Sequence, residues 1–289
     1  MPKDRAPLHE MIAPMRLTAV VDIGAAELGS PSYQPLVDLE IATVIGFEPQ
    51  PSLFAKLSER KRDLETYFPF AVGDGRTHVL HVCSHALMSS FLKPDPRQLH
   101  QFIPMSQWGH VVSKHEMPTR RLDDIAEITA IDFLKVDVQG FELAVLQNGR
   151  KKLADAVAIQ VEVPFITTYE NQPTLGDIDL ELRSQGFVPH MFFDIVVRML
   201  APMLPPEGTW RGLNQLHEGD LIYVKDFSRA EALSDEQLKH VVLLAHFCFR
   251  SYDLAYRALH MLVERKVISS GILQEYFAML RPSPSPPRG

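Results

Sequence analysis

The sequence has few cysteines and no long apolar run. Its two cysteines, Cys83 and Cys248, lie far apart and form neither a metal-binding nor a disulfide spacing. No segment approaches the ~20 consecutive apolar residues of a membrane-spanning helix. The first residues, MPKDRAPLHEMIAPM, carry charges and prolines where a secretory signal needs an apolar core. These absences predict a soluble, cytoplasmic protein with no membrane partner.

The chain also lacks an excess of basic residues. It has 36 acidic and 29 basic side chains and a formal net charge of −7. Nucleic-acid-binding domains usually carry the opposite excess, so no nucleic-acid partner is predicted. The 289 residues are 46% hydrophobic, which is ordinary globular composition and enough chain for one large domain with an appendage.

Up to residue 228, short β-rich runs alternate with helical patterns. Such alternation is typical of α/β proteins with a mostly parallel sheet. The predicted strands are residues 17–24, 42–49, 65–74, 131–139 and 156–165, with an additional edge strand at 76–84. The predicted helices are residues 32–40, 51–61, 140–155 and 174–187, the last closed by Gly186.

The end of the chain departs from this alternation. Residues 187–197 and 220–228 are β-rich with no crossover helix between them, so we expect them to pair antiparallel. Beyond them the patterns are purely helical, and Ser234 with Gln237 forms a capping box. The apolar stripe there, which includes Leu243, Phe247 and Leu254, is expected to be core or interface.

These patterns divide the chain into four predicted regions. They are an N-terminal extension (1–16), a sheet domain (17–228), a helical appendage (229–281) and a disordered tail (282–289). A C-terminal appendage of this kind is suited to homodimer formation through its helices.

The loop after the first predicted strand suggests a nucleotide-type cofactor. Gly24-x-Ala26-x-x-Gly29 is a loose dinucleotide fingerprint, and Glu48 ends the second predicted strand. An acid at about this distance binds ribose hydroxyls in NAD enzymes. The same acid serves S-adenosylmethionine in class I methyltransferases, so these residues alone leave both cofactors open.

Ala26 favours S-adenosylmethionine over NAD. In dinucleotide sites the second glycine lets the backbone approach a pyrophosphate, and S-adenosylmethionine has no phosphate. Asp22, at the end of the first strand, is placed to meet the ammonium group of that cofactor. The antiparallel ending and the lack of a large second domain point the same way. An NAD-dependent oxidoreductase is the alternative.

Ordered segments from Val20 to Asp226 resemble the FkbM-type methyltransferases. Each is weak alone, but together they are specific: VVDIGA, GFEPQP, AVGDG, SSFLKP, TRRLDDI, FLKVDVQGFELAVLQNG, VEVPFITTYENQP and NQLHEGDLIYVKD. The first loop departs from the family pattern, because Ala26 replaces the usual asparagine and Gly29 arrives one residue late.

The resemblance implies a Rossmann-like class I methyltransferase sheet, mostly parallel with a closing antiparallel hairpin, followed by the small helical appendage. It implies O-methylation, with S-adenosyl-L-methionine, of a hydroxyl on a sugar, glycan or secondary metabolite. The implied cofactor residues are Glu48 and Pro49 for the ribose, Asp22, Gly24, Ala25 and Ala26 for the methionyl part, and Ala71, Gly73 and Asp74 for the adenine. The alternative outside active enzymes is a degenerate domain that serves as a binding module.

Asp137 and Glu162 are the candidate catalytic residues. They end the fourth and fifth predicted strands, where ligands collect in open α/β sheets, and an alcohol acceptor needs a base. Asp137 has an alternative role as a helix N-cap. The partner of Glu162 could be the substrate, Lys135 or a metal, and without a third ligand no metal is predicted. Lys135 is expected in an ion pair, and Glu142 is expected to complement the helix dipole.

Two polar loops and two histidines are candidate acceptor-binding residues. Ser89 and Ser90 lie in one loop, Tyr169 and Gln172 in another, and His190 and His217 fall on the expected acceptor side. The alternatives are solvated loops and structural histidines.

Overall fold

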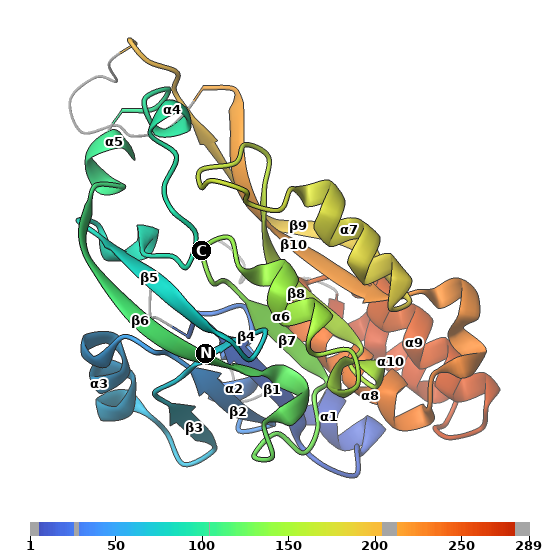
Figure 1. Ribbon diagram of the computed structural model, residues 1–289. Helices are drawn as coiled ribbons and strands as arrows, with labels where there is room; N and C mark the ends of the chain where they lie inside the picture. The colour runs from blue at the N-terminus through green and yellow to red at the C-terminus, as the bar shows by residue number, and fades with distance from the viewer. Residues whose placement is uncertain (1–5, 26–28, 104, 204–212, 281–289) are drawn as a thin grey trace, which may run out of the picture. The chain divides into compact units, whose positions relative to one another are not determined.

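The structure, a computed structural model, describes residues 6–25, 29–103, 105–203 and 213–280. Its main feature is a sheet of seven strands in the order β3-β2-β1-β7-β8-β10-β9 (Figure 1). The first five of these are β1 (Thr18–Ile23), β2 (Ala42–Phe47), β3 (Glu65–Phe68), β7 (Phe133–Val136) and β8 (Ala158–Pro164). Neighbours among them pair in parallel wherever their register is recorded. The predicted parallel α/β architecture is therefore confirmed.

The last two strands form the predicted antiparallel hairpin. β9 (Phe187–Arg198) pairs with β10 (Gln215–Lys225), and β10 also pairs antiparallel with β8. The chain thus inserts its final strand between the fifth and sixth strands of the sheet. This register places Asp220 opposite Glu162, so both side chains lie on one face of the sheet.

The predicted third strand, residues 65–74, is two strands. β3 ends before Pro69, which has no N–H for a sheet hydrogen bond, and β4 (Ala71–Gly73) follows in a second sheet. That sheet has the order β4-β6-β5, with β5 (Thr77–Cys83) at its edge. The sequence analysis missed β6 (Val111–Arg121), because its side chains do not alternate clearly in polarity.

The predicted helices form, with shorter bounds. They are α2 (Gln34–Asp38), α3 (Pro51–Arg60), α6 (Glu142–Gln147), α7 (Leu175–Ser184), α8 (Asp235–Leu243), α9 (Tyr252–Glu264) and α10 (Gly271–Leu280). One predicted helix was too long. The helix over 140–155 ends at Asn148–Gly149 and resumes only as the 3-10 turn η4 (Lys152–Ala154). In the predicted helical region α8 continues into the π-helix η6 (Leu244–Phe249), and the segment TRRLDDI contains the 3-10 turn η3 (Leu122–Asp124).

The short helices are α1 (Ala6–Ile12), α4 (Pro96–Leu99) and α5 (Met105–Trp108), with 3-10 helices η2 (Ala86–Met88) and η5 (Phe227–Ala232). The capping box of Ser234 with Gln237 is confirmed at the start of α8. None of the helices in the described part of the chain is long and apolar enough to span a bilayer.

One face of the seven-stranded sheet carries the apolar core. α6 and α7 lie side by side along this face (Figure 1), and their residues Val145, Leu146, Ile178 and Leu182 are fully buried there. Alternate residues of the strands point to the opposite face. Lys135 and Gln160, which are register partners, belong to that face, and so does Glu162. The polar residues of the strands are thereby kept out of the apolar core.

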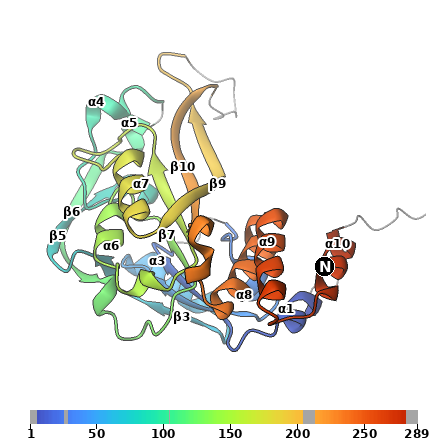
Figure 2. The same ribbon diagram turned by 90° about the vertical axis from the view of Figure 1, so that its right-hand side faces the viewer.

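By their internal contacts, the residues separate into two compact units. One contains residues 19–29 and 44–228; the other contains 1–18, 30–43 and 229–289. In the second unit α8 and α9 run side by side (Figure 2), and α1 packs on α8. Leu243, Phe247 and Leu254 are buried, so the predicted packing stripe is confirmed. The predicted tail, 282–289, lies outside the described residues.

Candidate active site

A cavity lies at the carboxyl ends of β1, β2 and β7, where ligands bind in open α/β sheets. It encloses about 770 Å³ of empty space, part of which is open to solvent. Its polar lining includes Glu48, Gln50, Ser89, Ser90, Asp137 and Gln139, and its apolar lining includes Phe47, Leu53, Phe70, Leu80 and Phe91. The lining therefore offers both apolar surface for a flat group and side chains that form hydrogen bonds.

The first loop enters this cavity through Gly24. Its φ is +82°, and a Cβ atom there would lie 1.9 Å from the backbone oxygen of Asp137, so only glycine fits. The backbone N–H groups of Gly24 and Ala25 both donate to the backbone oxygen of Phe47. This loop is thus held against the ends of both β2 and β7. Ala26 lies outside the described residues.

Glu48 is a buried carboxyl group at the end of β2. Its Oε1 accepts a hydrogen bond from the backbone N–H of Gln50 at 2.7 Å. Burial raises the pKa of Glu48 to about 7, and the carboxylates of Asp22 and Asp137 add to the rise. Among the described residues no hydrogen-bond donor is recorded for its other oxygen. A buried carboxyl group with one unused oxygen in a cavity is suited to the hydroxyl groups of a ribose.

Asp22 has a different environment from Glu48. Lys135 Nζ lies 3.3 Å from Asp22 Oδ1, and the two residues are register partners on β1 and β7. Burial alone would lower the pKa of Lys135, but the carboxylates of Asp22, Asp137 and Asp220 raise it above its usual range. The predicted ion pair of Lys135 is confirmed. Asp22 does not line the cavity.

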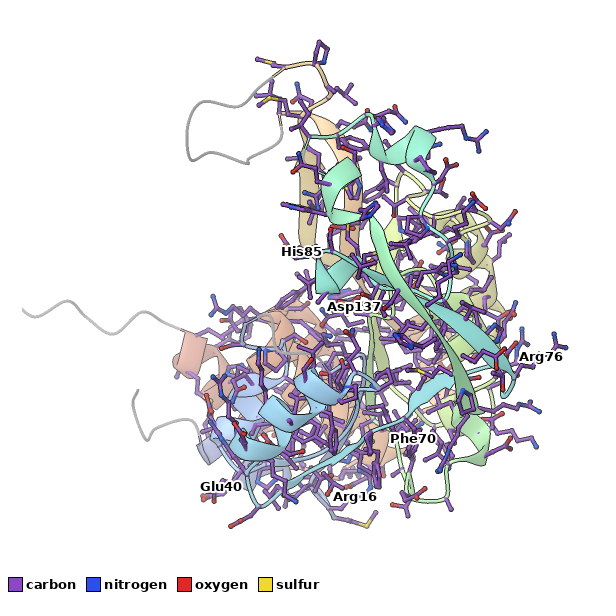
Figure 3. The ribbon with its side chains drawn as sticks, turned by 60° about the vertical axis from the view of Figure 1, so that its left-hand side comes forward. Arg16, Glu40, Phe70, Arg76, His85 and Asp137 are labelled. Atoms are coloured by element: carbon purple, nitrogen blue, oxygen red, sulfur yellow. The ribbon has the colours of Figure 1, made fainter. Side chains whose placement is uncertain are left out.

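Asp137 and Glu162 come together through one side chain between them. Gln139 Nε2 donates to Asp137 Oδ1 at 2.9 Å and to Glu162 Oε2 at 3.1 Å. Asp137, labelled in Figure 3, lines the cavity together with Ala86 and Leu87 of η2. It is not the N-cap of α6, because that helix begins at Glu142 with Phe141 as its N-cap. The alternative role of Asp137 as a cap was therefore wrong.

Glu142 closes the turn that carries Asp137 and Gln139. Its Oε1 accepts from the backbone N–H groups of Val138 at 2.9 Å and Gly140 at 3.0 Å. Burial raises the pKa of Glu142 to about 7, and the nearby Asp137 adds to the rise. The two hydrogen bonds act in the opposite direction and lower the pKa. Glu142 therefore stabilises the loop between β7 and α6 through these two hydrogen bonds, and it is also an acid in the first turn of α6.

Three carboxylates meet at this turn. Oxygens of Asp137, Glu142 and Glu162 lie within 4.8 Å of one another. Protein N–H groups donate to all three residues, and the side-chain amide of Gln139 donates to two of them, Asp137 and Glu162. An amide donor competes with a cation for the same oxygens, so we assign no metal to this cluster.

The residues predicted for the adenine side separate in the structure. Ala71 lines the cavity, as does Pro49 on the predicted ribose side, whereas Gly73 and Asp74 do not. Gly73 packs against Phe141, where a Cβ atom would lie 2.8 Å from its ring. Asp74 Oδ1 lies 2.7 Å from His78 Nε2, and although burial opposes it, this contact lowers the pKa of Asp74.

The predicted acceptor-side serines line the same cavity. Ser89 Oγ accepts from the backbone N–H of Cys83, and Ser90 Oγ donates to the backbone oxygen of Gln139 at 2.5 Å. Tyr169 Oη donates to Gln139 Oε1 at 3.1 Å and so reaches the carboxylate turn.

The other predicted acceptor residues lie away from the cavity lining. Gln172 Oε1 accepts from the backbone N–H groups of Thr168 and Tyr169 and shapes their loop. His217 is buried with its ring edge-on to Phe102, and His190 is half-buried on β9.

The sequence analysis missed Gln139 as a site residue. It lies inside the quoted block FLKVDVQGFELAVLQNG, directly after the candidate base, but an uncharged residue in a turn carries no chemical signal of its own. The aromatic walls Phe70 and Phe91 were missed for a similar reason, since apolar residues next to strands are expected in the core.

The sheet order and the position of the cavity define the class of the protein. A mostly parallel sheet whose last strand is inserted antiparallel beside the fifth has the Rossmann-like arrangement of class I methyltransferases. A buried acid at the end of β2 and a glycine turn after β1 face the cavity, as expected for S-adenosylmethionine.

Residues 22–189 match the methyltransferase FkbM domain. This match covers more than half of the chain, and the protein belongs to the FkbM methyltransferase family. The cofactor of this family is S-adenosylmethionine, so the expected methyl donor is confirmed. No curated protein sequence matches the chain.

Solved methyltransferase structures are similar to the chain at low identity. Magnesium protoporphyrin IX methyltransferase from Synechocystis PCC 6803, with bound SAM, is 10% identical with a TM-score of 0.39, over 76% of this chain and 77% of that one. A precorrin-6y C5,15-methyltransferase from Geobacter metallireducens GS-15 is 12% identical with a TM-score of 0.37, over 76% of this chain and 87% of that one.

Proposed function

We propose that the protein methylates a hydroxyl group of a sugar, glycan or other secondary metabolite, using S-adenosylmethionine. The observation that carries this proposal is the position of Asp137. Its side chain lines the cavity that also contains Glu48, and it shares the amide of Gln139 with Glu162. A carboxylate pair therefore lies beside the cofactor cavity, where an alcohol acceptor requires a base.

The cavity residues would hold the cofactor by three kinds of contact. Glu48 would accept hydrogen bonds from the ribose hydroxyls, because one of its oxygens already has a backbone partner and the other has none recorded among the described residues. Phe70, Leu53 and Phe91 would enclose the adenine ring. The Gly24 turn would lie against the methionyl part, since any side chain there would clash with Asp137.

The reaction needs positioning and one proton acceptor. When bound, S-adenosylmethionine supplies an electrophilic methyl group, so the acceptor oxygen forms a bond to carbon as the carbon–sulfur bond breaks. The proton of the acceptor hydroxyl passes to a carboxylate of the protein and later to solvent. The products are the methyl ether, S-adenosylhomocysteine and that proton.

Asp137 is our first choice for the base and Glu162 the second. Burial, with Asp137, Glu218 and Glu142 close by, raises the pKa of Glu162 well above its usual range. The ionised form of Glu162, which a base needs, is therefore disfavoured. Asp137 is also the one of the two that lines the cofactor cavity.

The first experiment is calorimetric titration with S-adenosylmethionine, S-adenosylhomocysteine and NAD. Binding of the two adenosyl compounds without NAD supports the proposal and justifies a screen of hydroxylated acceptors by mass shift. Binding of NAD alone would favour an oxidoreductase, and no binding would favour a degenerate binding module. With an acceptor in hand, Asp137→Asn should lower kcat by about 10² to 10⁴ and leave cofactor affinity within a few-fold.

A further inference from the structure

The turn between β7 and α6 holds a non-glycine residue in the left-handed conformation. Gln139 has a φ of +56°, a region that residues with a Cβ atom seldom adopt. The turn sits at the carboxyl end of the sheet, beside the cavity. A residue kept in such a conformation at a candidate site indicates that its side chain has a task there.

Three structural elements hold the side chain and backbone of Gln139. Tyr169 Oη donates to its Oε1 at 3.1 Å, and Ser90 Oγ donates to its backbone oxygen at 2.5 Å. Glu142 accepts from the backbone N–H groups on both sides of it. Because the hydroxyl of Tyr169 occupies Oε1, the amide nitrogen is directed to the carboxylates.

The amide nitrogen contacts both candidate bases. Nε2 lies 2.9 Å from Asp137 Oδ1 and 3.1 Å from Glu162 Oε2, so its two hydrogens serve one oxygen of each. Among the ion pairs recorded for the described residues, none reaches Asp137 or Glu162. The second oxygen of each carboxylate has no recorded donor in the same part of the chain.

We infer that Gln139 is a positioning residue that holds Asp137 and Glu162 together as one acceptor-side pair through its amide nitrogen. The inference rests on the proposed function, which makes one of these carboxylates the base. Without the amide donor, two carboxyl groups would face each other with nothing between them. The pair would then retain a proton to higher pH, because like charges disfavour joint ionisation.

Several other charged or titratable groups face this pair and belong to any account of its titration. They are Asp22 on β1, Glu48 after β2, Lys135 on β7, Glu142 on α6, Tyr169 in the loop after β8, and Glu218 and Asp220 on β10. Gln139→Leu changes none of these residues and adds no ionisable group, so a change in titration in this variant can be traced to the amide.

The test compares Gln139→Leu with the cofactor-free wild-type protein. The side-chain carboxyl carbons of ¹³C-labelled Asp and Glu are titrated by NMR, and the Glu162 and Asp137 signals are identified by their loss in Glu162→Gln and Asp137→Asn. We expect the apparent midpoint of the pair to rise by about one pH unit, a tenfold increase in proton affinity. Gln139→Glu, which has the same shape but no amide donor, should raise it further.

Matched controls come from an exposed glutamine on α6. Gln147→Leu and Gln147→Glu change the same residue type outside the site and should leave the midpoint unchanged. If Gln139→Leu does not fold, Tyr169→Phe replaces it. This variant keeps the ring, frees the amide to rotate and should give a smaller shift in the same direction.

Calorimetry with S-adenosylmethionine and S-adenosylhomocysteine separates the two proposals. In Gln139→Leu the ratio of the affinity for the cationic S-adenosylmethionine to the affinity for S-adenosylhomocysteine should fall several-fold at pH 6. If Gln139 had a purely structural role, its substitution would weaken the binding of both ligands equally. A midpoint that does not move, or an equal loss for both ligands, would overturn the inference. If wild-type protein binds neither ligand while the midpoint moves, the proposed function fails and the positioning role of Gln139 stands.

Discussion

Asp22 and Glu162 are both acids on parallel strands of the same sheet, yet their surroundings differ. Asp22 on β1 is 3% exposed and has Lys135 at 3.3 Å. Glu162 on β8 has an amide hydrogen bond from Gln139 and four neighbouring acids, Asp137, Glu142, Glu218 and Asp220. The charge of the first acid is balanced by a cation, whereas the surroundings of the second raise its pKa and disfavour its ionised form.

The carboxyl ends of the strands therefore carry two kinds of acid, an ion-paired one on β1 and one surrounded by other acids on β8. An ion-paired carboxylate holds its charge over a wide pH range and stabilises neighbouring strands when both partners are present. A protonated or shared carboxyl group can exchange a proton near neutral pH, which is what acid–base catalysis requires. A carboxyl group is therefore ion-paired at β1, whereas at β8 it belongs to the pair proposed to accept a proton.

The largest expected effect comes from removing the cation. Lys135→Met removes the cation beside the buried Asp22 and should lower the free energy of unfolding by about 3–5 kcal/mol in chemical denaturation. The double variant with Asp22→Asn should recover most of this loss, because it removes the buried negative charge as well. If Lys135→Met were as stable as the wild-type protein, the ion pair of Asp22 would not distinguish it from Glu162 in this way.

The second prediction concerns pH and Glu48. Its pKa is about 7 in the folded protein, above the ordinary value of 4.5, so the folded state binds more protons between these pH values. The unfolding free energy should therefore fall as pH rises from 4.5 to 7, by about 3 kcal/mol for this group. Glu48→Gln should remove that share of the slope, whereas Glu59→Gln, at an exposed position on α3, should not. If the unfolding free energy had the same pH dependence in Glu48→Gln and in Glu59→Gln, the raised pKa of the buried Glu48 would be contradicted.

A third variant tests Glu48 as a ligand for the cofactor. Glu48→Ala should weaken S-adenosylmethionine binding about 30-fold, near 2 kcal/mol, because two hydrogen bonds to a charged group are lost. Calorimetry of Glu59→Ala provides the matched control. An unchanged affinity in Glu48→Ala would remove Glu48 from the cofactor site.

The smallest expected effect distinguishes Glu162 from Asp22 directly. Glu162→Gln should raise the unfolding free energy by about 1 kcal/mol at pH 9 and by less at pH 6, because burial and the neighbouring acids penalise the ionised carboxyl group of the wild-type protein. Asp22→Asn should destabilise the protein at both values, since Lys135 loses its partner. The two substitutions thus have opposite signs at pH 9, measured by the same denaturant titration.

Much of this architecture was predictable because strands and helices leave local signatures. Apolar runs such as residues 17–24 and 131–139 indicated buried parallel strands, and the missing crossover helix before residue 220 indicated the antiparallel end. Gly24 and Glu48 were predicted together, because a turn and an acid after consecutive strands meet at one edge. β6 was missed, since its pairing with β5 and β4 depends on contacts far along the chain.

The sequence by itself determined the mostly parallel sheet with its antiparallel end, the family resemblance that implied the cofactor, and the acids at the strand ends. Only the tertiary structure decided how those acids are neutralised, because Lys135 reaches Asp22 across 113 residues and Gln139 reaches Glu162 across 23. It also decided which polar residues line the cavity, since Ser89 and Ser90 do so whereas Gln172 braces a loop. Residue type is encoded locally, but burial and partnership arise when distant segments pack, and these set the chemistry of a carboxyl group.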